Sequence, residues 1–227
     1  MKNQFIFDAD ETIFNTLTPF HATAECAVLN KRFNISITPE IISARFDGGP
    51  RRRVFQELVP DYNDYNSLVE EKWKIMYFLV SKNPIRCLPG MYELIKYLWV
   101  KNIPISIASA APIHWIKECT EKSVCYDFQV QNPKLSKIFG DQIFSAQDCN
   151  NQKPAPDVFL KAQSRMKKTK GDTFVIGDAR ADVLGGTSAG FRVLYLSKEN
   201  EEFDRIEKVK RFQNSLELSD YITKELV

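Results

Sequence analysis

The chain has few of the residues on which disulfide scaffolds and zinc sites depend. Its 227 residues include only five cysteines and two histidines. No two cysteines form a C-x-x-C pair and no histidine lies at a ligand spacing from them, so neither a disulfide framework nor a structural zinc site is indicated. We expect the odd number of cysteines to remain as reduced thiols inside a cell. The two histidines, His21 and His114, have no evident partner and receive no role.

Long apolar runs and a strong net charge are also missing. Only three apolar residues separate the polar N-terminus from Asp8, too few for a secretory signal, and no later stretch approaches the roughly 18 residues of a membrane span. The formal net charge is +2, with both signs scattered along the chain, which argues against a nucleic acid or an anionic membrane as a partner. We therefore expect a cytoplasmic protein, and no pattern indicates its oligomeric state.

What is present is material for a sizeable core. Hydrophobic residues make up 44% of the chain, and there are 16 phenylalanines. The length exceeds the common domain size of roughly 100–150 residues. One α/β core with an added subdomain would use that length.

The opening segment combines a buried strand with two acids. The apolar residues of segment 4–7 are followed by Asp8 and Asp10, one residue apart, and then by Thr12. An unpaired charge at the end of a buried strand costs on the order of several kcal/mol, so Asp8 requires a cation or a reacting group nearby. In isolation the two acids are also compatible with a turn capped by an aspartate.

Residues 16–86 read as helical. Apolar residues recur at helical spacing after the acidic loop, and Thr38 followed by Pro39 has the pattern of a helix N-cap with proline at the first helical position. Further helices are predicted at about 52–58 and 65–80. No segment in this region alternates convincingly as a strand does.

After Pro89 and Gly90, short apolar strands alternate with helices. This alternation is typical of a parallel sheet covered on both faces. Right-handed crossovers then place the carboxyl ends of the strands on one edge, where ligands bind in such sheets. We expect Asp8, Ser109 and Asp178 to converge there. The predicted strands after the first are at 103–108, 142–145, 173–177 and 193–196, the last of which closes the series.

Four polar clusters follow strands in this order. Each has a plainer interpretation alone: Ser109 as an N-cap, Lys153 as a solvated loop lysine, and Asp178 as an acid in the first turn of a helix. Together their order and spacing resemble the haloacid dehalogenase-like superfamily, with the resemblance weakest in 16–86 and after about 197. The clusters are Asp8-Ala9-Asp10-Glu11-Thr12, Ser109, Gln152-Lys153-Pro154-Ala155-Pro156-Asp157 and Gly177-Asp178-Ala179-Arg180-Ala181-Asp182.

The resemblance implies a fold and a domain organisation. It predicts an α/β, Rossmann-like parallel-sheet core formed by residues 1–15 and 87–227, with residues 16–86 inserted as an α-helical cap subdomain. The position of that insert resembles the helical-cap subclass typified by phosphoglycolate phosphatase and β-phosphoglucomutase. A cap of this kind would close over the catalytic edge and determine which substrate is accepted.

The resemblance also implies roles for the acids. Asp8 would be the nucleophile, since an ionised carboxylate attacks phosphorus without an activating base. Magnesium (Mg²⁺) would be the cofactor, bound by Asp8, the backbone carbonyl of Asp10 and the side chain of Asp178, because a hard cation offsets the repulsion between carboxylates and a phosphate. Asp182 would hold a water on the metal or orient Lys153.

The remaining roles concern the leaving group and the phosphoryl oxygens. By the resemblance Asp10 is the general acid for the departing alcohol and then the base for the attacking water. Ser109 would donate a hydroxyl, Lys153 would supply a positive charge, and Thr12 and the backbone N–H of Ala110 would contact the substrate.

The predicted cap contains one candidate for substrate binding. Arg51 follows Gly48, Gly49 and Pro50, and some relatives place a cap arginine after such a glycine to hold the far anionic group of the substrate. The alternative is a solvent-facing basic helix start. Elsewhere the chain departs from the common pattern, with Glu11 at a position often held by glycine. Such departures advise against naming a substrate.

The resulting hypothesis is a Mg²⁺-dependent phosphatase that acts on a small phosphorylated metabolite through an aspartyl-phosphate. The alternatives are a phosphomutase of the β-phosphoglucomutase type and a non-catalytic binding protein that keeps the fold. A dehalogenase is disfavoured because Asp10 is present, and a phosphonate-cleaving enzyme lacks a motif around a cap lysine.

Overall fold

The computed structural model describes residues 2–46, 51–167, 170–197 and 202–227. The chain divides into two compact units. The first contains Met1–Phe14 and Arg86–Val227, and the second contains Asn15–Ile85. The first unit is built on a β-sheet and the second is helical.

The central sheet of the first unit has six strands among the described residues, and every pair in it is parallel. This confirms the predicted parallel α/β core. β1 lies inside the sheet, with Phe5 opposite Ile105 on one side and opposite Phe174 on the other. The strands, in the order β6-β4-β1-β7-β8-β9, are Ile143–Ser145, Ile105–Ser109, Gln4–Phe7, Thr173–Gly177, Arg192–Leu196 and Val209–Phe212.

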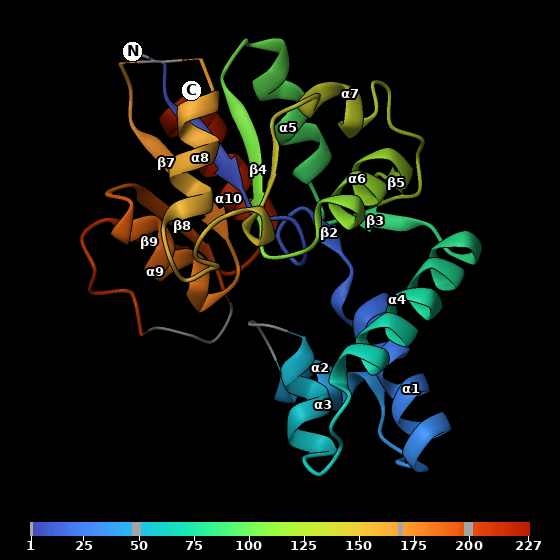
Figure 1. The fold of residues 1–227 in the computed structure, drawn as a ribbon. Helices are drawn as coiled ribbons and strands as arrows, with labels where there is room; N and C mark the ends of the chain where they lie inside the picture. Colours follow the sequence, from blue (N-terminus) through green and yellow to red (C-terminus); the bar gives the residue numbers. More distant parts are fainter. Residues whose placement is uncertain (1, 47–50, 168–169, 198–201) are drawn as a thin grey trace. The chain divides into compact units, whose positions relative to one another are not determined.

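Helices cover both faces of this sheet, as Figure 1 shows with α8 and α10 on opposite sides. Ile6 points to a core cluster that includes Val175 and Phe159, while Phe5 and Phe174 stack with ring centroids 5.4 Å apart. Successive strand residues are therefore buried on opposite faces, which explains the continuous apolar runs in the sequence. The helices are α5 (Met91–Val100), α6 (Ile113–Lys122), α7 (Leu135–Phe139), α8 (Asp157–Arg165), α9 (Arg180–Ser188) and α10 (Ser215–Tyr221).

One prediction about the sheet is wrong, because the strand series does not end at residue 196. β9 pairs with β8 in parallel, with Val209 opposite Val193 and Phe212 opposite Leu196. Only the two ends of β9 are buried, and Lys210 between them is exposed. An edge strand needs no continuous apolar run, and charged residues on it discourage pairing with other chains, so its sequence does not look like that of a central strand.

Three very short strands form a second sheet in the order β2-β3-β5. They are Phe14–Asn15, Ile85–Cys87 and Ser123–Val124. The first two include the points where the chain passes from one unit to the other. Strands of two or three residues leave too short a pattern to be read from sequence.

The second unit consists of helices around its own apolar core. The predicted helices are confirmed, and the Thr38 side chain accepts a hydrogen bond from the Ile41 N–H as the N-cap pattern indicated. Val28, Phe55 and Leu68 are fully buried in this core. The helical segments are η1 (Leu17–Ala22), α1 (Thr23–Phe33), α2 (Pro39–Arg45), α3 (Arg52–Leu58) and α4 (Tyr65–Lys82).

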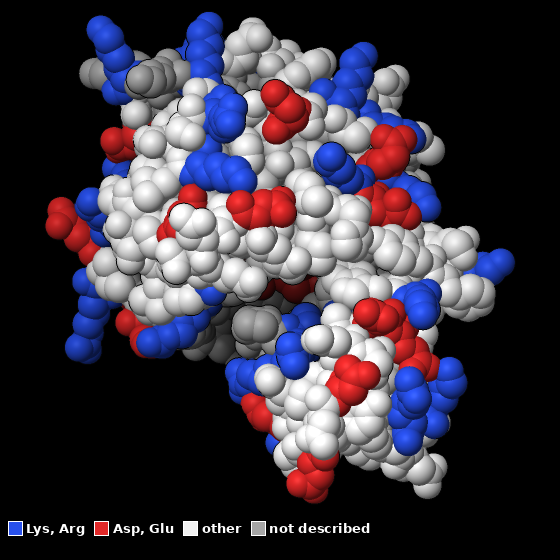
Figure 2. Space-filling model, viewed as in Figure 1, with Lys and Arg blue, Asp and Glu red and all other residues white. Residues whose placement is uncertain are grey.

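The surface of the chain is mixed in charge. In the view of Figure 2, lysine and arginine residues are interspersed with aspartate and glutamate residues, in keeping with the formal net charge of +2. In the part of the chain that the structure describes, no helix combines the length and the apolar character needed to cross a membrane.

Candidate active site

The loop after β1 holds the two acids of the opening motif. The Asp8 N–H donates to the carbonyl of Ile176 on β7, at a distance of 2.8 Å. The loop then turns tightly, because the N–H groups of Ile13 and Phe14 both donate to the carbonyl of Ala9. Glu11 lies in this turn with φ +56°. That left-handed conformation favours glycine, since it costs other residues roughly 1–2 kcal/mol.

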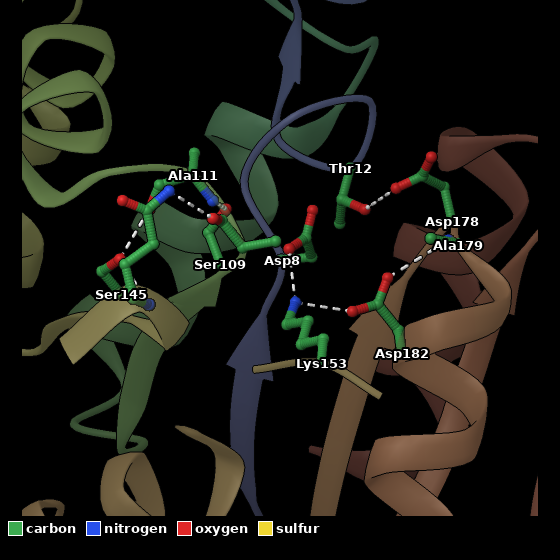
Figure 3. A network of polar contacts seen from close by, with 11 residues as sticks. Asp8, Thr12, Ser109, Ala111, Ser145, Lys153, Asp178, Ala179 and Asp182 are labelled. Carbon is green, nitrogen blue, oxygen red and sulfur yellow. Dashed lines mark hydrogen bonds and ion pairs between the residues drawn. The ribbon is translucent and has the colours of Figure 1, made fainter. Parts of the chain in front are cut away.

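Lys153 lies between two carboxylates at this edge of the sheet (Figure 3). Its Nζ is 2.6 Å from Oδ1 of Asp8 and 2.6 Å from Oδ1 of Asp182. The Lys153 side chain is only 3% exposed and the Asp182 side chain 1%. The Ala179 N–H donates to the second oxygen of Asp182 at 3.1 Å. Asp182 therefore contacts the ammonium of Lys153, and this contact is the one that the second of its two predicted roles, orienting Lys153, requires.

Asp178, which follows β7, completes a group of three acids. One carboxylate oxygen of each of Asp8, Asp178 and Asp182 lies within 4.8 Å of the others. The hydroxyl of Thr12 donates to Oδ1 of Asp178 at 2.9 Å. Thr12 is fully buried, so in this structure it holds a carboxylate of the acidic group. The sequence had suggested a substrate contact for it.

The charges in this group do not balance. Burial raises the pKa of Asp8 to about 7, opposed by Lys153 and assisted by Asp182 and Asp10. Burial and the charges of Asp8, Asp182 and Glu11 likewise raise the pKa of Asp178 well above its usual range. Burial also acts to lower the pKa of Lys153, but the two carboxylates that contact it prevail and raise it.

Among the described residues, one ammonium, that of Lys153, contacts two of these three carboxylates, so the described group lacks positive charge. Carboxylate oxygens converging within a few ångströms are the ligands that a hard divalent cation prefers. The residues therefore fit Mg²⁺, with Asp8 and Asp178 as side-chain ligands and Asp182 held by Lys153. Such a cation would lower the pKa values of the acids around it.

Gly177, the last residue of β7, lies against the carboxylate of Asp182. A Cβ atom at this position would be 2.4 Å from Cγ of Asp182. We expect Gly177→Ala to displace that carboxylate from Lys153, to lower the free energy of unfolding by about 1–3 kcal/mol and to weaken Mg²⁺ binding. Urea unfolding and calorimetric titration with Mg²⁺ measure the two effects.

Gly140→Ala is the matched control for this substitution. No atom lies within 4 Å of a Cβ at Gly140, although its φ of +56° strains any side chain. The control should lose some stability through its backbone but should bind Mg²⁺ as the native chain does. Equal Mg²⁺ affinity in Gly177→Ala would contradict the role given to the Asp182 contact.

Ser109 ends β4, the strand next to β1, and is buried. Its Oγ accepts a hydrogen bond from the Ala111 N–H at 3.1 Å. The turn that follows is fixed from the neighbouring segment, because Ser145 donates to the Ala111 carbonyl and Gln147 donates to the Ala110 carbonyl. The carbonyl groups of Ala110 and Ala111, in the turn after β4, are thus both hydrogen-bonded.

Asp10 has a neighbour that the sequence reading missed. The indole Nε1 of Trp115, in the first turn of α6, donates to Oδ1 of Asp10 at 3.0 Å. Trp115 is completely buried. The signal in the sequence for this contact was a tryptophan six residues after Ser109. An apolar residue in a helix is ordinarily expected to pack in the core, so the tryptophan did not indicate a contact with Asp10.

Arg51 lies in the helical unit and is bound by a buried acid. Its Nε donates to Oε1 of Glu25 at 3.0 Å, a second nitrogen contacts the other oxygen of Glu25, and Nη1 donates to the Phe46 carbonyl at 2.8 Å. Three donors of the guanidinium are thus engaged within the unit. The Asp47-Gly48-Gly49-Pro50 turn that the sequence placed before Arg51 lies outside the described residues.

Glu25 also contacts a buried lysine. Nζ of Lys72 is 3.4 Å from Oε1 of Glu25 and 2.9 Å from Nδ1 of His21. The expectation that His21 has no partner was therefore wrong. The residues are 51 positions apart, so no local spacing could have indicated the contact.

Comparison with known proteins agrees with this geometry. A family model described as haloacid dehalogenase-like hydrolase matches residues 5–196. The (DL)-glycerol-3-phosphatase 2 of Arabidopsis thaliana is 27% identical over 197 residues, covering 83% of this chain and 77% of that protein. The pyrophosphatase PpaX of Halalkalibacterium halodurans is 26% identical over 202 residues, covering 84% and 81%.

Another relative shares a shorter region. The bifunctional riboflavin kinase/FMN phosphatase of Arabidopsis thaliana is 30% identical over 117 residues, which are 52% of this chain but only 28% of that protein. The matched half of this chain therefore spans little more than a quarter of the length of that relative.

Solved structures share the fold over the whole chain. A putative β-phosphoglucomutase from Thermotoga maritima covers 100% of both chains with a TM-score of 0.75 at 19% identity. A putative phosphoglycolate phosphatase from Lactobacillus plantarum covers 97% of this chain and 99% of its own, with a TM-score of 0.72 at 17% identity. With the family model spanning the acidic motifs after β1 and β7, the chain belongs to the haloacid dehalogenase-like hydrolase family.

Proposed function

We propose that this chain is a Mg²⁺-dependent phosphatase that hydrolyses a small phosphorylated metabolite through an aspartyl-phosphate on Asp8. The observation that carries the proposal is the buried contact of 2.6 Å between Asp8 and Lys153 at the carboxyl end of β1, with Asp178 in the same acidic group. The names of two relatives, a glycerol-3-phosphatase and a pyrophosphatase, support phosphate-ester or anhydride hydrolysis as the reaction class.

In the first step an oxygen of Asp8 attacks phosphorus and the bond to the leaving oxygen breaks. In this proposal the Lys153 ammonium compensates the charge that the phosphoryl oxygens gain, and Ser109 and the Ala110 N–H donate to the same oxygens. Bound Mg²⁺ supplies further charge compensation between the carboxylates and the phosphoryl group. Asp182 keeps Lys153 in place throughout.

Asp10 moves the protons in both steps. As a carboxylic acid it gives its proton to the leaving oxygen. As a carboxylate it then takes a proton from the water that attacks the aspartyl-phosphate, so that phosphate leaves and Asp8 is restored. The proton taken from the water returns the carboxyl group of Asp10 to the protonated state for the next turnover.

The helical unit is proposed as the cap that selects the substrate. It enters the sequence between the motif after β1 and Ser109, the last residue of β4, and has a core of its own. The guanidinium of Arg51 already donates hydrogen bonds to Glu25 and to the Phe46 carbonyl. To bind an anionic group of the substrate as well, it would have to share these donors. We therefore give Arg51 first the role of partner to the buried Glu25.

The proposal is tested by phosphate release from a panel of sugar phosphates, nucleotides, glycerol phosphates and phosphoglycolate. We expect free phosphate to accumulate from at least one of them with Mg²⁺ present, and release to stop when EDTA removes the cation. A phosphomutase would instead convert a sugar phosphate to its isomer with little free phosphate. Release that is unaffected by EDTA would contradict the metal requirement.

A further inference from the structure

We propose that Trp115 is a positioning residue for proton transfer: its indole N–H holds the carboxyl group of Asp10 in the orientation from which the leaving oxygen is protonated. The inference rests on the proposed function, in which Asp10 is the acid. It assigns a role to a side chain outside the acidic motifs.

The contact joins two separate segments of the site. Asp10 belongs to the loop after β1, and its backbone forms an isolated bridge with Phe14. Trp115 belongs to α6, which follows the Ser109 turn. The backbone N–H of Trp115 donates to the Pro112 carbonyl at 3.0 Å. The distance of 3.0 Å between Nε1 and Oδ1 therefore ties the acid to the turn that carries Ser109.

The chemistry of the indole suits this task. An indole N–H is a donor only, so it fixes which carboxyl oxygen faces it. With Oδ1 accepting that hydrogen bond, the rotation of the Asp10 carboxyl group is fixed. The ring is rigid and completely buried, so the geometry is held without further loss of conformational freedom when a substrate arrives.

A purely structural interpretation makes a different prediction. A buried indole N–H needs some hydrogen-bond partner, and Asp10 could serve only to satisfy it. Removing the N–H would then leave the relative rates on different substrates unchanged. If Trp115 positions the acid, the loss falls on substrates whose leaving group must be protonated.

The experiment compares two esters of different leaving groups. p-Nitrophenyl phosphate releases a stable phenolate that needs no proton in the transition state, whereas benzyl phosphate releases a strongly basic alkoxide that does. We expect Trp115→Phe to lower kcat/KM for benzyl phosphate by about tenfold or more, because general acid catalysis contributes roughly 10²–10⁴-fold, and to change kcat/KM for p-nitrophenyl phosphate much less. Trp99→Phe, at a half-exposed tryptophan of α5, should affect neither.

Other outcomes are equally informative. Equal losses on both esters, or no loss on either, would overturn the positioning role while leaving the phosphatase proposal standing. Failure of the native protein to release phosphate from either ester and from the metabolite panel would overturn both. If Trp115→Phe does not fold, benzothienylalanine at position 115 replaces the N–H by sulfur in a ring of the same shape, and the same ratio of losses is expected.

Discussion

Asp8→Asn is expected to abolish Mg²⁺-dependent release of phosphate, with turnover lower by a factor on the order of 10⁴ or more. The amide is not a nucleophile, so no aspartyl-phosphate forms, and the other residues of the site act on the same step and cannot replace it. The measurement is release of p-nitrophenol from p-nitrophenyl phosphate. Unchanged turnover would remove Asp8 as the nucleophile.

The same variant should keep its fold, and pH provides the check. In the ion-free protein the pKa of Asp8 is raised from 3.8 to about 7, so the folded state binds this proton more tightly than the unfolded state. Its contribution to stability therefore falls as pH rises from about 4 to 7. Asparagine has no such dependence. In Asp8→Asn the Lys153 ammonium keeps Asp182 as its partner, so in EDTA at pH 8 the variant should melt no lower than the native chain. A clearly lower melting temperature would mean that lost activity reflects unfolding.

Lys153→Met is expected to affect both activity and stability. The methionine keeps the apolar stem of the side chain but removes the ammonium that contacts Asp8 and Asp182. Removing one partner of a buried ion pair costs about 3–5 kcal/mol, and removing a donor to the transition state costs about 10²–10³-fold in turnover. Urea unfolding in EDTA and phosphate release with Mg²⁺ measure the two losses.

The stability loss in Lys153→Met should depend on pH with a definite sign. Without the ammonium, the pKa of Asp8 rises beyond its already elevated value. At pH 5 the acid is neutral in both proteins, whereas at pH 8 the variant must either keep a proton on Asp8 or bury a charge that Lys153 no longer compensates. The loss should therefore be larger at pH 8 than at pH 5. Lys161→Met is the control, since this half-buried lysine of α8, the helix that follows Lys153, donates to the backbone carbonyl of Asp148 at 3.2 Å. A loss equal at both pH values would contradict the proposed charge balance.

Much of the first unit follows from its sequence because its strands are short and buried on both faces. The predicted strand 173–177 is β7, and Asp178 comes directly after it. Once strands are parallel, the carboxyl ends must share an edge, and this places Asp8, Lys153 and Asp178 together from positions far apart in the chain. Gly177 is explained only by the structure, which shows its contact with Asp182.

Other features could not be predicted because they depend on contacts that leave no periodic pattern. The hydrogen bond from Trp115 to Asp10 joins a helix to a loop 105 positions away. Glu25 and Lys72 look like surface residues of amphipathic helices, yet both are buried because each supplies the charge that the other needs. Strand β9 was not predicted because it lies at the edge of the sheet, where a strand needs no continuous apolar run in its sequence.

The place of β1 inside the sheet has a consequence for how the protein is made. Its Phe5 pairs with Ile105 and Phe174, so at roughly 5–20 residues per second the ribosome takes several seconds or more to supply both neighbours. The helical unit, continuous from Asn15 to Ile85, is synthesised entirely within that interval, and its local contacts favour early folding. Asp8 is thus synthesised before the helical unit, and the strands beside it are synthesised only after that unit.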